Sequence, residues 1–167
     1  ETKMPGAIIT RIAKSHIRIG TFQWFSATSD TKNLQTLLDY SVKRHYPNVT
    51  TTAEFLRAVC LRQAELVAKW MGIGFIHGVM NTDNCLISGE TIDYGPCAFI
   101  DEYNPDKVFS SIDSFGRYSF TNQSKVIIWN LAQLANSLLI LHENEAGTLE
   151  EFQDCLLYTS PSPRDSF

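Results

Sequence analysis

The sequence lacks the features that would mark several classes of protein. No apolar run approaches the roughly 18 residues needed to span a bilayer. The richest run, Val126 to Leu141, is interrupted by four polar side chains and therefore predicts a buried helix. A formal net charge of −4 gives no reason to expect nucleic acid as a partner. No secretory or transit peptide is visible, which leaves the compartment open.

The spacing of the cysteines argues against a zinc site. The 4 cysteines show neither a CxxC pair nor a histidine partner at a spacing suited to zinc. Cys60, Cys85 and Cys97 lie in apolar or strand-like surroundings. This pattern predicts buried free thiols in a reducing compartment rather than a disulfide.

What the chain does contain indicates one folded domain. Its 167 residues suffice for one core, and its 44% hydrophobic and 11% aromatic content is typical of globular proteins. Apolar residues at helical spacing predict helices over residues 32–46, 51–70 and 124–143. Thr51 and Glu54 form a capping-box pattern at the start of the second helix. The expected class is α+β and mainly helical.

The remaining segments predict short strands and loops. Residues 7–12 are rich in isoleucine and predict a strand, followed by a turn or short helix over 15–25. Residues 85–100 predict short strands joined by tight turns, and 101–122 predict a polar loop.

The two ends of the sequence are unusual. The chain opens on Glu1 without an initiator methionine, so we expect the true N-terminus to be missing. After Phe152 the composition changes abruptly, and the final stretch resembles translated adapter sequence. We therefore predict a partial domain over residues 1–154 and a non-native or disordered tail over 155–167.

Two motifs carry the chemistry: HGVMNTDN at residues 77–84 and TIDYG at residues 91–95. Phosphoryl and nucleotidyl transfer need a divalent metal that bridges phosphate oxygens, cations that neutralise charge, and a group that positions the attacking hydroxyl. Magnesium prefers hard oxygen ligands and takes few of them from protein. Asn84 and Asp93, flanking a predicted β-hairpin, are the candidate metal ligands.

The candidate general base is Asp83, which is the remaining carboxylate in the loop. Val79 stands where a kinase would carry its catalytic aspartate, so Asp83 is expected to take the vacated role. The alternative is that these Asp and Asn side chains only make local backbone hydrogen bonds. We expect His77 to have a structural role, tying the loop together through backbone carbonyls.

Two arginines precede the first predicted helix. Arg11 and Arg18 flank the segment that contains AKSHI. The planar guanidinium group donates paired hydrogen bonds and stays charged, which suits phosphate. Spacing alone leaves open the alternative that both are ordinary surface residues.

Taken together, long stretches resemble the selenoprotein O family, also called the YdiU family, of protein-kinase-like adenylyltransferases. The stretches are HGVMNTDNCLISGETIDYGPCAFIDEYNP, PGAIITRIAKSHIRIGTFQWF, VFSSID, GRYSF and NQSKVIIWNLAQLA. The resemblance covers roughly residues 1–150 and implies a fragment of a kinase-like fold, with most of the C-lobe core and no N-lobe. It implies transfer of AMP from ATP, bound inverted relative to kinases, to Ser, Thr or Tyr hydroxyls of protein substrates.

The same resemblance implies a role for each candidate residue. Asp83 would be the proton acceptor, and Asn84 and Asp93 would bind Mg²⁺ (or Mn²⁺), with Asp93 also beside the nucleotide. Arg11 and Arg18 would bind ATP. Family members occur in bacterial cytoplasm and eukaryotic mitochondria, so either compartment is expected according to the source.

The family pattern is incomplete in this stretch. The family's glycine-rich nucleotide loop and ATP-contacting lysine would lie before Glu1, and its C-terminal region is also absent. We therefore expect this stretch to be inactive alone. Two alternatives to adenylyl transfer stay open: an ordinary kinase-like phosphotransferase, and a non-catalytic pseudokinase module that only binds ATP.

Overall fold

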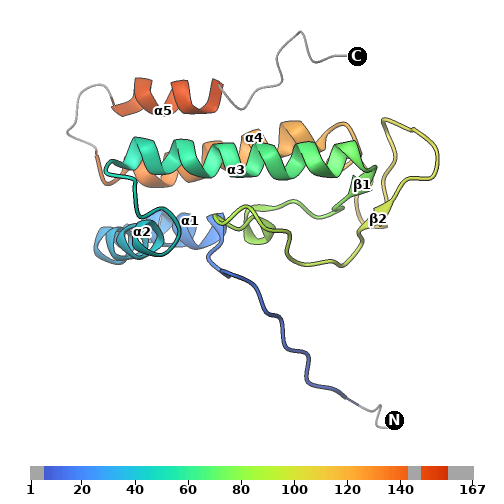
Figure 1. Ribbon diagram of the computed structural model, residues 1–167, viewed down its shortest axis with the longest axis horizontal. Helices are drawn as coiled ribbons and strands as arrows, with labels where there is room; N and C mark the ends of the chain where they lie inside the picture. The colour runs from blue at the N-terminus through green and yellow to red at the C-terminus, as the bar shows by residue number, and fades with distance from the viewer. Residues whose placement is uncertain (1–5, 143–147, 158–167) are drawn as a thin grey trace.

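The computed structural model describes residues 6–142 and 148–157, and it is mainly helical (Figure 1). Helix α5 lies on one side of the pair α3 and α4, and α1 and α2 lie on the other side. None of the helices within the described ranges is long and apolar enough to cross a membrane. The helices are α1 (Ile19–Ala27), α2 (Thr31–His45), α3 (Thr52–Gly72), α4 (Gln123–Leu139) and α5 (Thr148–Leu157).

Helix α3 is the central element, and its start follows the predicted capping box. The Thr51 hydroxyl accepts a hydrogen bond from the Glu54 N–H at 3.1 Å, and the Glu54 carboxylate accepts one from the Thr51 N–H at 3.3 Å. These bonds satisfy backbone donors that a helix start otherwise leaves free. The end of α3 leads through Gly74, whose φ of +70° suits glycine, into the short strand β1 (Phe75–Ile76).

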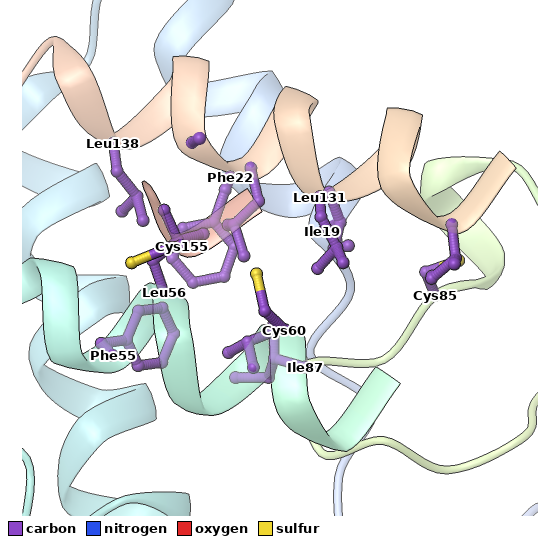
Figure 2. Close-up of a cluster of buried hydrophobic side chains, with 14 of the residues drawn as sticks. Ile19, Phe22, Phe55, Leu56, Cys60, Cys85, Ile87, Leu131, Leu138 and Cys155 are labelled. Carbon is purple, nitrogen blue, oxygen red and sulfur yellow. The ribbon is translucent and has the colours of Figure 1, made fainter. Parts of the chain in front are cut away.

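The core lies where α1, α3 and α4 meet, with α5 covering one side. Figure 2 shows Ile19 and Phe22 of α1 packed among Phe55 and Leu56 of α3 and Leu131 of α4. These five side chains are fully buried. Burying each large apolar side chain contributes about 1.5–3 kcal/mol. The core therefore fixes α1 against α3 and α4.

The predicted strands over 85–100 are confirmed only in a reduced form. Strand β1 pairs antiparallel with β2 (Ala98–Phe99), and this is the only sheet in the part of the chain that the structure describes. Between the two strands, Cys85 and Thr91 form a single bridge rather than a full hairpin. Residues 101–122 form the expected loop, without a helix or named strand.

The prediction of a strand over residues 7–12 is wrong. This segment forms an arm that runs away from the helices (Figure 1), and Ile8 and Ile12 are 97% and 93% exposed. A strand requires a neighbour that accepts and donates its backbone hydrogen bonds. Among the described residues, the arm first finds such a neighbour at Ile17 to Ile19.

The C-terminal part of the chain also differs from the prediction. The helix predicted over 124–143 ends at Leu139, and α5 was not predicted. Phe152 and Cys155 of α5 are buried against the core. The predicted domain boundary at residue 154 therefore falls inside a helix, and most of the predicted tail lies outside the described residues.

The four cysteines are free thiols, as predicted for Cys60, Cys85 and Cys97, although Cys97 is less buried than expected. Cys60, Cys85 and Cys155 are buried and Cys97 is half-buried. Burial raises the pKa of both Cys60 and Cys85 to about 12, so these thiols are protonated at neutral pH.

Candidate functional site

Residues 11–18, the arginine segment, lie directly beside the HGVMNTDN loop. Ile19 donates its N–H to the Cys85 carbonyl at 3.0 Å, and Ile87 donates its N–H to the Ile17 carbonyl at 3.1 Å. Arg18 and Leu86 form an antiparallel bridge between these two bonds. The pairing brings residues about 70 positions apart into one site, which sequence spacing did not reveal.

His77 holds the two chemical motifs together. It is fully buried, its Nε2 atom lies 2.7 Å from the Ile92 carbonyl, and its Nδ1 atom accepts the Val79 N–H at 3.3 Å. This pattern requires a neutral ring with the proton on Nε2. Burial lowers the pKa of His77, against the opposing effects of the Ile92 hydrogen bond and the Asp93 charge. The predicted structural role of His77 is confirmed.

Asp83 lies in a short 3₁₀ helix, η1 (Thr82–Asn84), against the start of α1. A Cβ atom built on Gly20 would lie 2.0 Å from the Asp83 Oδ1 atom, so the carboxylate occupies the space that a side chain at Gly20 would fill. The first turn of a helix has free N–H groups and a partial positive charge, which favour a carboxylate. Asp83 remains exposed to solvent.

Gly20 is a site residue that the sequence did not single out. A glycine in the first turn of a predicted helix has no chemistry of its own. Its importance depends on the approach of Asp83, which is 63 positions away in the chain.

The side chain of Asn84 is oriented by the loop itself. Its Nδ2 atom donates to the Val79 carbonyl at 3.0 Å, and its backbone N–H donates to the Asn81 carbonyl at 3.0 Å. Because the amide nitrogen is used inside the loop, the Oδ1 atom is left as the acceptor or metal ligand. Val79, at the position where a kinase-like loop is expected to carry an aspartate, thus contributes its backbone oxygen.

Asp93 lies directly after the carbonyl that His77 holds. Its φ of +63° is uncommon for a residue other than glycine, and such conformations concentrate at functional sites. The Arg11 Nη2 atom lies 3.6 Å from the Asp93 Oδ1 atom. Both side chains are partly exposed, so this ion pair contributes little stability. The ion pair does bring Arg11, a predicted ATP-binding residue, to Asp93, a predicted metal ligand.

Arg18 has an unused donor in a buried position. Its Nε atom is buried and has no hydrogen-bond partner among the described residues. An unpaired buried donor is costly, and an arginine in this state favours an acceptor with several oxygens, such as phosphate. Arg11 and Arg18 therefore differ, because Arg11 is exposed on the arm and Arg18 is anchored at the loop.

The donor set suits magnesium better than a softer metal. No three His, Cys, Asp or Glu side chains form a cluster within the described ranges, which leaves no closed protein cage. The Asp93 carboxylate and the Asn84 Oδ1 atom are both hard oxygen ligands. Magnesium in phosphate-transfer sites takes one or two protein ligands and completes its shell with phosphate and water, so the residues present fit it.

Comparison with known proteins identifies the class and then the family. Several relatives carry the name "Protein nucleotidyltransferase YdiU". The relative from Jannaschia sp. (strain CCS1) is 57% identical over 156 residues, which are 93% of this chain and 32% of the relative. The relative from Bacillus mycoides (strain KBAB4) is 58% identical over 159 residues, which are 92% of this chain and 33% of the relative.

The family described as "Protein adenylyltransferase SelO" matches residues 1–160, and the chain belongs to this family. The resemblance inferred from the motifs is thereby confirmed. The chain spans about a third of the length of the curated relatives it matches.

Proposed function

We propose that this chain supplies the catalytic loop of a protein adenylyltransferase, within the C-lobe part of a kinase-like fold. The reaction is transfer of AMP from ATP to a Ser, Thr or Tyr hydroxyl of a protein substrate. The observation that carries the proposal is the convergence of Asp83 and Arg18 at the start of α1, with an exposed carboxylate and an unpaired buried guanidinium donor. The family membership supports the same reaction class.

Asp83 acts as the base in this proposal. The substrate hydroxyl gives its proton to the Asp83 carboxylate while its oxygen forms a bond to the α-phosphorus atom. The bond between that phosphorus and the oxygen bridging to the β-phosphate breaks, and pyrophosphate leaves. Arg11 and Arg18 bind the phosphate oxygens and offset their negative charge.

Asn84 and Asp93 are the proposed ligands of Mg²⁺, or of Mn²⁺. A bound divalent cation neutralises charge on the phosphate oxygens during transfer. The chain's own contribution is orientation: Val79 fixes the Asn84 amide, and His77 fixes the backbone beside Asp93. Arg11 partly neutralises Asp93 at 3.6 Å.

The two alternatives fit the loop less well. A standard kinase places its base five residues before the metal-binding asparagine, where this chain has Val79. A pseudokinase module that only binds ATP would not require Asp83 to be exposed beside the arginine segment.

The decisive experiment uses a full-length protein containing this sequence and ATP labelled on either the α- or the γ-phosphate. We expect label to reach protein substrates only from the α-position. The Asp83→Asn variant should lose about 10²–10⁴-fold in transfer rate, as expected for removal of a general base. Asp39→Asn, at an exposed carboxylate on α2, is the matched control and should keep the full rate. Transfer of the γ-label alone would establish a kinase, and no transfer of either label would favour the pseudokinase.

A further inference from the structure

Asn130 is a buried amide in the middle of α4. Both of its side-chain hydrogen bonds are with the proposed catalytic loop, residues 77–85. The side chain is fully buried. Its Nδ2 atom donates to the Met80 carbonyl at 2.9 Å and to the Cys85 Sγ atom at 3.0 Å. The two N–H groups of one amide therefore reach two points on the loop.

Those two points bracket the residues of the proposed chemistry. Met80 precedes and Cys85 follows residues 81–84, which include Asp83 and Asn84. Inside this segment, the Asn84 N–H donates to the Asn81 carbonyl at 3.0 Å, closing a single tight turn. Because the turn is short and internally bonded, its orientation depends on where its two ends are held.

A second buried amide on the same helix holds the start of the loop. The Gln123 Oε1 atom accepts the His77 N–H at 3.0 Å, and its Nε2 atom donates to the Phe75 carbonyl at 3.0 Å. Gln123 is also fully buried and lies seven residues, or about two turns, before Asn130. Both amides therefore lie on the loop-facing side of α4, a helix that is packed into the core.

The unused oxygen of Asn130 supports a role in orientation. Its Oδ1 atom is buried and has no hydrogen-bond partner among the described residues. An apolar side chain would avoid this unsatisfied oxygen, but it would leave the Met80 carbonyl without its donor. The contacts made by the amide nitrogen are thus the feature that distinguishes asparagine from an apolar residue at this position.

We propose that Asn130 is a positioning residue for the transfer reaction, which sets the place of Asp83 and Asn84 by holding Met80 and Cys85. The inference rests on the proposed function. Gln123 holds the start of the loop at Phe75 and His77, so that α4 supports both ends of the loop. Asn130 itself touches neither substrate nor metal.

The first test compares Asn130→Ala with Asn136→Ala in the full-length protein. Asn136 is an exposed asparagine on the same helix and is the matched control. We expect Asn130→Ala to lower kcat about 10- to 100-fold, because a displacement near 1 Å has effects of this size. The KM for ATP should change less than kcat, since Arg18 keeps its own pairing with Leu86. A kcat equal to that of Asn136→Ala would overturn the proposal.

A second variant tests the donor directly and serves if the alanine variant does not fold. Asn130→Asp introduces a carboxyl group of nearly the same shape, and burial raises the pKa of such a group. The protonated form donates to the Met80 carbonyl, and the ionised form cannot. The ratio of its kcat to that of the wild type should therefore fall as pH rises from about 6 to about 9.

The surroundings of Asn130 keep this readout specific. Cys85 touches the introduced carboxyl, but burial raises the pKa of Cys85 to about 12, so its thiol does not ionise in this range. Burial lowers the pKa of His77, at the other end of the loop, which moves its titration toward lower pH and away from this range. Thermal unfolding at each pH corrects the rate for the folded fraction.

The outcomes separate the two proposals. A wild-type protein without AMP transfer refutes the proposed function, whatever the variants do. An active wild type with a pH-independent ratio for Asn130→Asp refutes the positioning role alone. A raised KM for ATP with unchanged kcat also refutes it, because the defect would then lie in nucleotide binding.

Discussion

At the scale of single residues, the site depends on Gly20, a residue without a side chain. Gly20 leaves the space above the first turn of α1 into which the Asp83 carboxylate fits. Helix starts usually hold a carboxylate from their own first turn, whereas here the carboxylate comes from a distant loop. One glycine thus links the placement of α1 to the placement of the proposed base.

This link predicts a substitution that lowers the transfer rate without lowering the stability of the fold. In Gly20→Ala, the new Cβ atom would lie 2.0 Å from Asp83 Oδ1, and the flexible carboxylate must move away. We expect the transfer rate to fall at least about tenfold. Alanine favours a helix by up to about 1 kcal/mol over glycine, so the melting temperature should change little or rise.

The control for this prediction is Gly72→Ala in α3, where an added Cβ atom would have no neighbour within 4 Å. It shares the gain in helix propensity and should leave the rate unchanged. If Gly20→Ala were as active as Gly72→Ala, Asp83 would not need its observed position.

At the scale of elements, the loop from β1 to Asp93 is held by polar side chains on its neighbours. Gln123 and Asn130 of α4 bind one part of it, Gln63 of α3 donates to the Leu86 carbonyl, and the Trp70 Nε1 atom donates to Thr91 at 3.1 Å. Buried backbone groups need such partners where no sheet provides them. These side chains therefore provide part of the support that sheet pairing would otherwise give the loop.

The loop that contains both motifs, residues 77–95, should become less stable at low pH because of His77. Its lowered pKa means that the folded protein disfavours the protonated ring, so the contribution of His77 is present above the unfolded pKa near 6.5 and is lost as pH falls below it. We expect amide hydrogen exchange at Val79 and across residues 91–95 to accelerate, relative to its intrinsic rate, as pH falls from about 7 to about 5.

The matched variants for this prediction are His77→Gln and His16→Gln. The first removes the titrating ring and should abolish the extra acceleration. The second alters an exposed histidine on the arm and should preserve it. Persistence of the extra acceleration in His77→Gln would assign it to another group.

The sequence predicted α2, α3 and α4 well because their signals are local. The Thr51–Glu54 capping box and the spacing of apolar residues in α3 depend on neighbours a few positions away. The strand predicted over residues 7–12 failed because pairing depends on a partner that local composition does not specify. The site shows the same division: Asp83 and Asn84 are recognisable by motif, whereas Gly20 and Asn130 matter only through contacts across the fold.

At the scale of the whole molecule, the arm is the least supported part of the proposed site. Ile8, Ile9 and Ile12 are exposed on it, and Arg11 reaches the body through a partly exposed ion pair with Asp93. Such a pair is worth about 0–1 kcal/mol, which does not fix an arm in place. The chain matches about a third of the length of its curated relatives, so in a full-length protein other residues are available to pack against these isoleucines.

The last prediction follows from this difference between the arm and the core. We expect the 167-residue chain on its own to keep the helices around α3 and α4, since their core side chains are buried within this chain, yet to transfer no AMP. Arg18 is anchored by the pairing with Leu86, but Arg11 is held only by its weak ion pair with Asp93, so ATP should bind at least about tenfold more weakly than to a full-length relative. Circular dichroism checks the fold, titration with fluorescent ATP checks binding, and α-labelled ATP checks transfer. Transfer by the short chain at the full-length rate would contradict the prediction and would mean that Asp83, Asn84, Asp93 and the two arginines suffice for the reaction.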